Sequence, residues 1–139
     1  MGKVQNIKNL PKEDIVFLYN YLTQYETELK SNYGHYDFKS SSLDNFCKKN
    51  KIIQKSKKNS KGENYFWFEA QKPQNQSVND IAHHLLRHIR NSIAHALVSK
   101  QGKYYLLQDY NRVSNQSMGG KIRTDLLPSF IDAIINTKT

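Results

Sequence analysis

The segment from residue 78 to 98 concentrates side chains that are suited to acid–base and phosphate chemistry. It carries four of the chain's five histidines together with Arg87, Arg90 and Asn91. Histidine has an ordinary pKa that suits proton transfer near neutral pH. Arginine presents a planar, permanently charged fork that matches phosphate oxygens. These residue types in one short segment predict proton transfer beside a bound phosphate.

The same segment is predicted to form one uninterrupted helix. Residues 78 to 98 include no Gly or Pro, and their apolar side chains repeat at helical spacing on one wide arc, as in the central helix of a bundle. The opposite arc is polar. At offsets of 0, 4, 7 and 11 along it, a single stripe carries His84, His88, Asn91 and His95.

The hexapeptide from Arg90 to His95 resembles the signature of the HEPN superfamily, in which an Arg and a polar residue precede a His on one helix. The longer string from Leu86 to Ala96 resembles the core motif of small stand-alone bacterial HEPN proteins. This resemblance implies a mostly all-α fold, a helical bundle. Strand-like residue types on either side of a polar bend at 111–115 predict one β-hairpin near residues 103–122, inserted between the helices. The resemblance also implies a metal-independent endoribonuclease with a toxin or phage-defence role.

The residues that the resemblance marks as catalytic are Arg90, Asn91 and His95. RNA cleavage by the ribose 2′-hydroxyl needs a base, an acid and positive charge against the phosphorane, which imidazole and guanidinium groups supply. Asn91, one turn before His95, is expected to orient the imidazole or hold the phosphate. The scheme requires no metal and no other cofactor. On the same helix, the side chains predicted to contact substrate are Arg87, His88 and His84.

Helix geometry separates two of these groups. Arg90 and His95 are five residues apart, so on an ideal helix they point roughly 140° apart. In the HEPN families that this chain resembles, the catalytic helices of two protomers face each other across a two-fold axis. We therefore expect a homodimer, in which Arg90 of one subunit approaches His95 of the other.

Two other classes of function remain open on the sequence alone. Asp80, His84 and His88 lie at successive four-residue spacings and could present ligands to a divalent ion, although three successive turns of a straight helix span too far to converge on one ion. The second alternative is a non-catalytic RNA-binding or protein-interaction module. An antitoxin protein is a possible partner, but some HEPN toxins are silenced at a Tyr where this chain has Leu97.

Composition favours a polyanionic partner and a single domain spanning residues 1–139. The formal net charge is +9 at pH 7, which attracts RNA non-specifically. The lone Cys47 excludes an internal disulfide and fits a cytoplasmic protein. No apolar run is long enough to span a bilayer, so no membrane partner is expected.

The remaining elements are predicted from local patterns. Pro11 marks the first turn of a helix that Gly34 ends, Ser42 caps a short helix, and Thr124 caps a final amphipathic helix. A Lys-rich loop is expected at about 48–62. It is either solvated or an RNA-backbone contact, and its candidate RNA-binding residues are Lys55, Lys57 and Lys58.

The aromatic block Tyr65, Phe66, Trp67 and Phe68 follows this loop. It is interpreted as a core anchor that leads into the central helix, with base stacking as the alternative.

Overall fold

The chain folds as helices packed on a mixed β-sheet, and the predicted all-α bundle is wrong. The computed structural model describes residues 10–58, 62–69 and 80–138. Within them the sheet has five strands in the order β1-β2-β5-β4-β3. The bounds of the strands are β1 Ile52–Ile53, β2 Asn64–Phe68, β3 Val98–Gln101, β4 Tyr104–Tyr110 and β5 Gln116–Arg123. β1 runs parallel to β2, and the other neighbouring pairs are antiparallel.

The predicted hairpin near residues 103–122 is present as β4 and β5, but it forms the centre of the sheet and is not an insertion in a bundle. Burial alternates along β4, since Tyr105 and Leu107 are buried while their neighbours are half-exposed. A second hairpin joins β3 to β4 through a two-residue turn at Gly102, whose φ of 60° suits a residue without a side chain.

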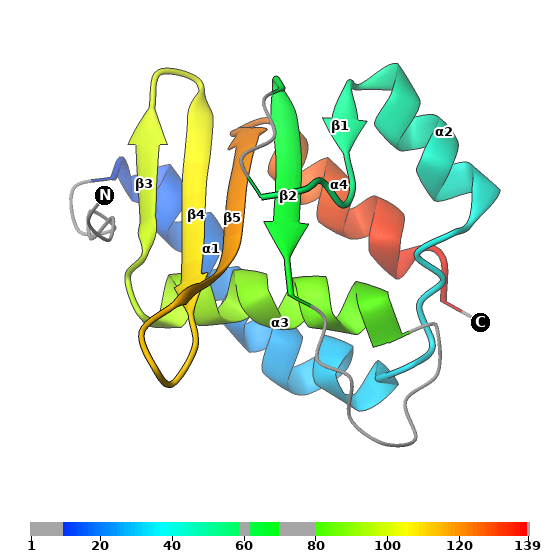
Figure 1. The fold of residues 1–139 in the computed structure, drawn as a ribbon, viewed down its shortest axis with the longest axis horizontal. Helices are drawn as coiled ribbons and strands as arrows, with labels where there is room; N and C mark the ends of the chain where they lie inside the picture. The colour runs from blue at the N-terminus through cyan, green and yellow to red at the C-terminus, as the bar shows by residue number, and fades with distance from the viewer. Residues whose placement is uncertain (1–9, 59–61, 70–79, 139) are drawn as a thin grey trace.

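The helices cover one side of this sheet. Their bounds are α1 Lys12–Gln24, α2 Ser41–Lys49, α3 Asp80–Ala94 and α4 Leu126–Ile135, and α1 continues through a π-helical turn at Tyr25–Leu29. In Figure 1, α1 and α4 lie behind the strands and α3 runs across the sheet near one end. The core forms between these helices and the sheet. Phe66 of β2, for example, stacks on Phe130 of α4 with ring centroids 5.5 Å apart.

The predicted helix over residues 78–98 is too long at its C-terminal end. α3 ends at Ala94, and Val98 already begins β3. Residues 78 and 79 lie outside the described ranges. The helix ends there because Ala96 adopts a left-handed φ of 58°. Leu97 then donates its backbone N–H to the Ser92 carbonyl at 2.7 Å, and Ala96 donates to Ile93 at 3.0 Å. These two bonds are the Schellman motif that closes a helix C-terminus.

Two predicted helix caps are displaced by one or two residues. Ser40, not Ser42, precedes α2, and the two hydroxyl groups are 2.8 Å apart. Asp125, not Thr124, precedes α4, and its carboxylate is paired with Arg123. Thr124 follows β5 directly and donates its backbone N–H to the carbonyl of Lys103, in the turn between β3 and β4, at 2.9 Å.

A buried carboxylate joins α1 to the sheet. Asp14 accepts a hydrogen bond from the Tyr105 hydroxyl at 2.5 Å and an ion pair from Lys100 at 3.1 Å. Burial and the bond to Asp14 raise the pKa of Tyr105. The ring hydroxyl therefore stays protonated as the donor. Within the described ranges, no helix combines the length and the apolar character needed to cross a membrane.

Candidate phosphate-binding site beside helix α3

The polar arc of α3 is largely buried inside its own chain. His83, His84 and His88 are all less than one-tenth exposed, while Arg87 and Asn91 are half-buried. The strands β2 and β4 lie against this part of the helix. The expected stripe is therefore divided, because His84 and His88 are enclosed, whereas His95 is exposed beyond the last helical residue.

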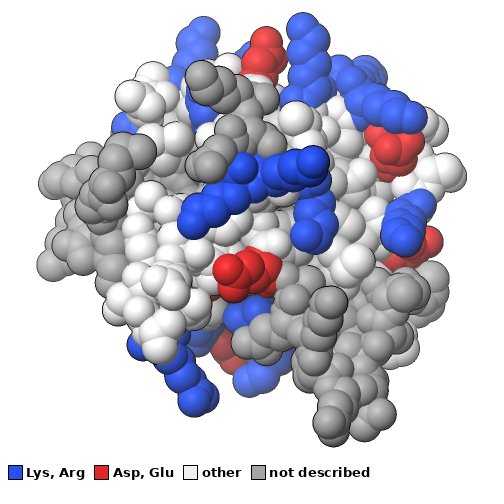
Figure 2. Space-filling model, in the orientation of Figure 1, with Lys and Arg blue, Asp and Glu red and all other residues white. Residues whose placement is uncertain are grey.

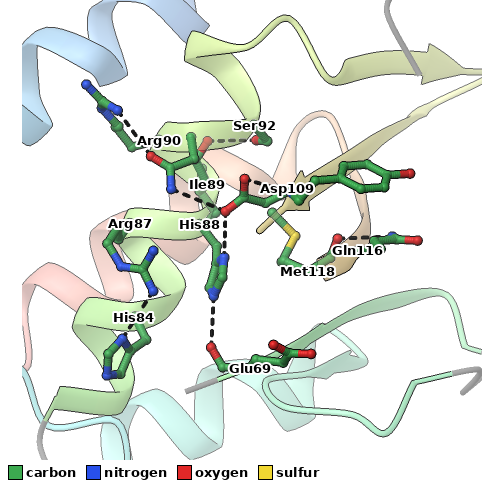
Figure 3. A network of polar contacts seen from close by, with 12 residues as sticks. Glu69, His84, Arg87, His88, Ile89, Arg90, Ser92, Asp109, Gln116 and Met118 are labelled. Carbon is green, nitrogen blue, oxygen red and sulfur yellow. Dashed lines mark hydrogen bonds and ion pairs between the residues drawn. The ribbon is translucent and has the colours of Figure 1, made fainter. Parts of the chain in front are cut away.

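His88 bridges three segments of the chain. Its Nδ1 atom lies 2.7 Å from Oδ2 of Asp109 in β4, and its Nε2 atom lies 2.9 Å from the backbone carbonyl of Glu69, just after β2. Figure 3 shows the ring between these two acceptors. Both contacts are hydrogen bonds at the same time only when both ring nitrogens carry protons. His88 thus holds the helix to two strands, and neither nitrogen is open to a substrate.

Asp109 is ionised in this setting. Burial raises the pKa of its carboxyl group. The hydrogen bonds from His88 and Asn91, the His88 charge and the Tyr110 N–H outweigh burial and bring the pKa below its ordinary value. The Asn91 amide donates to Oδ2 of Asp109 at 3.2 Å, and the Tyr110 N–H donates to Oδ1 at 2.9 Å. One buried carboxylate therefore organises the side chains around it.

Arg90 extends the same network outward. Its guanidinium donates to the Asn91 amide oxygen at 3.1 Å and lies 3.4 Å from the Glu26 carboxylate. Arg90 and Asn91, two of the predicted catalytic residues, therefore share one chain of contacts that leads to Asp109. In this arrangement Arg90 positions Asn91, and its charge is partly compensated by Glu26.

His95 occupies the C-cap of α3. Its backbone N–H still bonds to the Asn91 carbonyl at 3.0 Å, so it lies one helical turn beyond Asn91. Its side chain is exposed, unlike those of the three histidines earlier in the helix. Within one chain, the contacts of Arg90 run towards Glu26 and Asn91, and His95 stands at the helix end.

A cavity of about 530 Å³ opens beside the buried network. α3 contributes Arg87, His88 and Asn91 to its wall, and Arg112 comes from the loop between β4 and β5. The other lining residues are Glu69, Asp109, Tyr110, Asn111, Val113 and Ser117. Apart from the His88–Asp109 pair, the charged groups of the wall are the two guanidinium groups and the Glu69 carboxylate, so the guanidinium groups outnumber the remaining carboxylates by two to one. Such a wall suits a phosphate group.

His84 supports one of these guanidinium groups. Its Nδ1 atom lies 3.4 Å from Nη2 of Arg87, and Figure 3 shows the pair on α3 beside the His88 network. A guanidinium has five N–H donors, so this contact leaves Arg87 others for a ligand. His84 was predicted to contact substrate, but its side chain is buried and contacts Arg87. In the described ranges, no three His, Cys, Asp or Glu side chains lie close enough to hold a metal ion.

The Lys-rich segment is more structured than expected. Lys48 and Lys49 end α2 and residues 52–53 form β1, so the predicted loop at 48–62 is wrong over those residues; residues 59–61 lie outside the described ranges. Lys55 donates to the Phe68 carbonyl at 3.4 Å, and Lys58 lies over the Trp67 ring at 5.2 Å. Lys57 is exposed. These lysines border the sheet near β2.

The sequence analysis missed three charged residues of the cavity wall: Glu69, Asp109 and Arg112. A signal existed for Asp109, because it follows Tyr105 and Leu107 at a spacing of two on the inward side of a predicted strand. A carboxylate at an inward strand position needs a partner, and His88 is that partner. Glu69 acts through its backbone and Arg112 lies on a loop, so neither carried a comparable signal.

Comparison of the chain with protein families, with curated proteins and with solved structures finds no match to any of them.

Proposed function

We propose that the protein binds RNA and that the cavity beside α3 holds a backbone phosphate. The observation that carries this proposal is that Arg87 and Arg112 line the same cavity of about 530 Å³, a volume within the range of small-molecule binding pockets. The net charge of +9 supports a polyanion as the ligand. The proposal places the protein in the cytoplasm, where RNA is abundant.

The buried network explains why this wall would be pre-organised for a phosphate. His88 and Asp109 fix α3 against β4, and Asn91 is held from both sides by Arg90 and Asp109. A side chain fixed in this way loses little rotamer freedom on binding, which favours affinity. Arg90 and His88 act here as positioning residues, behind the groups that would touch RNA.

A second candidate function is metal-independent cleavage of the bound RNA. It is favoured by the exposed His95, one turn beyond Asn91 on the helix that forms the cavity wall. His95 would take the proton of a ribose 2′-hydroxyl, whose oxygen then bonds to phosphorus. The bond from phosphorus to the 5′-oxygen breaks, and that oxygen takes a proton from the second imidazole that a homodimer supplies.

The binding proposal is tested by RNA titration at several salt concentrations. Arg87→Gln and Arg112→Gln should each weaken binding and flatten the slope of log affinity against log salt by roughly 0.7 to 0.9 per lost phosphate contact. Lys12→Gln, at an exposed position on α1, is the matched loss of one charge and should leave the slope nearly unchanged. Equal effects of all three substitutions would mean that the cavity arginines contribute no more to RNA binding than any exposed cation, which would contradict the proposal.

The cleavage proposal is tested by incubating the purified protein with tRNA and mRNA in EDTA. Cleavage that survives chelation supports the cleavage proposal. If the RNA is bound but stays intact, the protein is a non-catalytic RNA-binding module. Sedimentation at micromolar concentration tests the homodimer, which would have twice the chain mass of 16.3 kDa. A monomer that still cuts RNA would contradict the two-subunit form of the proposal.

A further inference from the structure

The two faces of the sheet carry different side chains. Towards the helices, β2 directs Phe66 and Phe68 and β5 directs Met118 and Ile122, all of them buried. The opposite face carries side chains that are half-buried or exposed: Tyr65, Trp67, Tyr104, Leu106, Lys121 and Arg123. In the described ranges no helix covers this outer face, which is turned towards the viewer in Figure 1.

The strand register brings the outer aromatic residues together around β5. Tyr65 pairs with Lys121, Trp67 pairs with Gly119, and on the other side of β5 Tyr104 pairs with Arg123. Strands are roughly 4.8 Å apart, and alternate residues on a strand are separated by about 7 Å. Tyr65 and Trp67 are therefore about 7 Å apart along β2, and Tyr104 lies across the basic central strand β5 from them.

Gly119 makes room for the ring of Trp67. A Cβ atom at Gly119 would lie 2.3 Å from Nε1 and 3.0 Å from Cε2 of Trp67, closer than such atoms approach in proteins. The indole therefore lies directly over the glycine backbone. An aromatic ring seated on the sheet in this way is a platform on which a planar group can stack.

Positive charge accompanies the rings. The Lys121 ammonium lies 4.6 Å from the centroid of the Tyr104 ring, and the Lys58 ammonium lies 5.2 Å from that of Trp67. Figure 2 shows Lys and Arg side chains extending across the middle of this face. An ammonium over a ring occupies the place of a stacked base, so it must move aside when a base binds. Its flexible stem allows it to pair with the neighbouring phosphate.

We propose that this outer sheet face, formed by Tyr65, Trp67, Tyr104, Lys58 and Lys121, binds single-stranded RNA by stacking two or three bases on its rings. Stacking on sheet aromatics with cations beside them is a general mode of single-strand recognition. Bases in a duplex are already stacked on each other and cannot reach the rings. The inference rests on the proposed function in taking RNA as the partner, but it uses different residues.

Trp67 is the only tryptophan of the chain, so its fluorescence reports directly on this face. A short oligouridylate should quench Trp67 emission, and a duplex of equal length should quench it much less. Fluorescence anisotropy of labelled RNA then gives the affinities of the variants. Tyr65→Leu and Trp67→Leu should each weaken binding of the single strand roughly tenfold. Tyr65→Phe and Trp67→Phe keep a ring and should bind nearly as well as the unaltered protein.

Tyr19→Leu is the matched control, because Tyr19 is 50% exposed on α1, away from the sheet. Circular dichroism verifies that each Leu variant is folded, and the Phe variants keep the test valid if a Leu variant is not. Equal affinity of the Leu and Phe variants, or equal affinity for duplex and single strand, would overturn the proposal. A variant that dissociates a dimer without changing RNA affinity would assign the face to a second copy of the chain.

The outcomes for the two surfaces are separable. If only Arg87→Gln and Arg112→Gln weaken binding, the cavity holds RNA and the sheet-face inference fails. If only the Leu variants weaken binding, the sheet face stands and the cavity proposal fails. If the unaltered protein neither binds the oligouridylate nor shows quenching, both proposals fail.

Discussion

The Nδ1 atom of His88 lies 2.7 Å from Oδ2 of Asp109, and both side chains are only 3% exposed. This buried pair connects the histidine-rich helix to the central hairpin, two segments that are distant in the sequence. It also explains why a stripe of imidazoles lies on α3, since His88 has a structural partner and His84 supports Arg87. The pair is therefore the first target for mutation.

Removing one member of the pair should destabilise the fold strongly. Asp109→Ala leaves the buried His88 ring without its carboxylate partner, and removing one member of a buried pair typically costs about 3–5 kcal/mol. Urea unfolding followed by circular dichroism measures the change in the free energy of unfolding. Asp132→Asn, at an exposed position on α4, should alter it by less than about 0.5 kcal/mol. A small effect of Asp109→Ala would mean that the His88–Asp109 contact contributes little to the stability of the fold.

The pH dependence of the free energy of unfolding should show the contribution of the Asp109 carboxylate. Its pKa is lowered in the folded protein from an ordinary value of 3.8. A depressed folded pKa contributes stability that is present above the unfolded value and is lost as pH falls through the folded one. Stability should thus decrease below about pH 4, and Asp109→Asn should remove part of that decrease. Urea unfolding of both proteins between pH 3 and pH 7 gives the comparison, and parallel curves would contradict it.

The left-handed conformation of Ala96 offers a stabilising substitution. A non-glycine residue at a φ of 58° is strained, and the C′ position of a Schellman motif favours glycine. Ala96→Gly should increase the free energy of unfolding by about 1 kcal/mol. Ala94→Gly, two residues earlier and still helical, should instead decrease it by up to about 1 kcal/mol. Thermal unfolding distinguishes the two signs, and a loss of stability in both would contradict the assigned backbone conformation.

The central strand requires a glycine where Phe66 crosses it. A Cβ atom at Gly120 would lie 2.5 Å from two atoms of the Phe66 ring, which is itself stacked on Phe130. Gly120→Ala should therefore cost about 1–3 kcal/mol through overpacking. Phe66→Leu frees space at the same point, so the double variant should be less unstable than the sum of the single changes. Strict additivity in urea unfolding would show that the two positions do not touch.

Activity at His95 separates catalysis from binding. If RNA is cleaved in EDTA, His95→Ala should reduce the rate by a factor on the order of a hundred or more, with affinity little changed, because it removes a proton-transfer group and no permanent charge. Arg112→Gln should chiefly weaken affinity. Single-turnover cleavage and anisotropy measure the two quantities. An unchanged cleavage rate in His95→Ala would mean that His95 does not take part in the reaction.

Local patterns in the sequence predicted much of the secondary structure. Helical spacing predicted α1, α4 and most of α3, and strand-like residue types on either side of a polar bend predicted the β4–β5 hairpin. The core-anchor interpretation was confirmed for Phe66 and Phe68, which are buried. These features depend on interactions between near neighbours, which a single sequence displays directly.

The tertiary structure alone decided the fold class and the environment of each polar side chain. β3 forms only by pairing with β4, and β2 is a run of aromatics whose alternation is hidden because apolar rings lie on both of its faces. For the same reason Tyr65 and Trp67 were not separated from Phe66 and Phe68.

The partners of His88 come from β4 and from the end of β2, so no local periodicity could show that this histidine is buried and paired. Residue types and spacing along the chain therefore determined which groups were available for chemistry. Long-range strand pairing determined which of them were enclosed, because burial depends on segments far apart in the sequence.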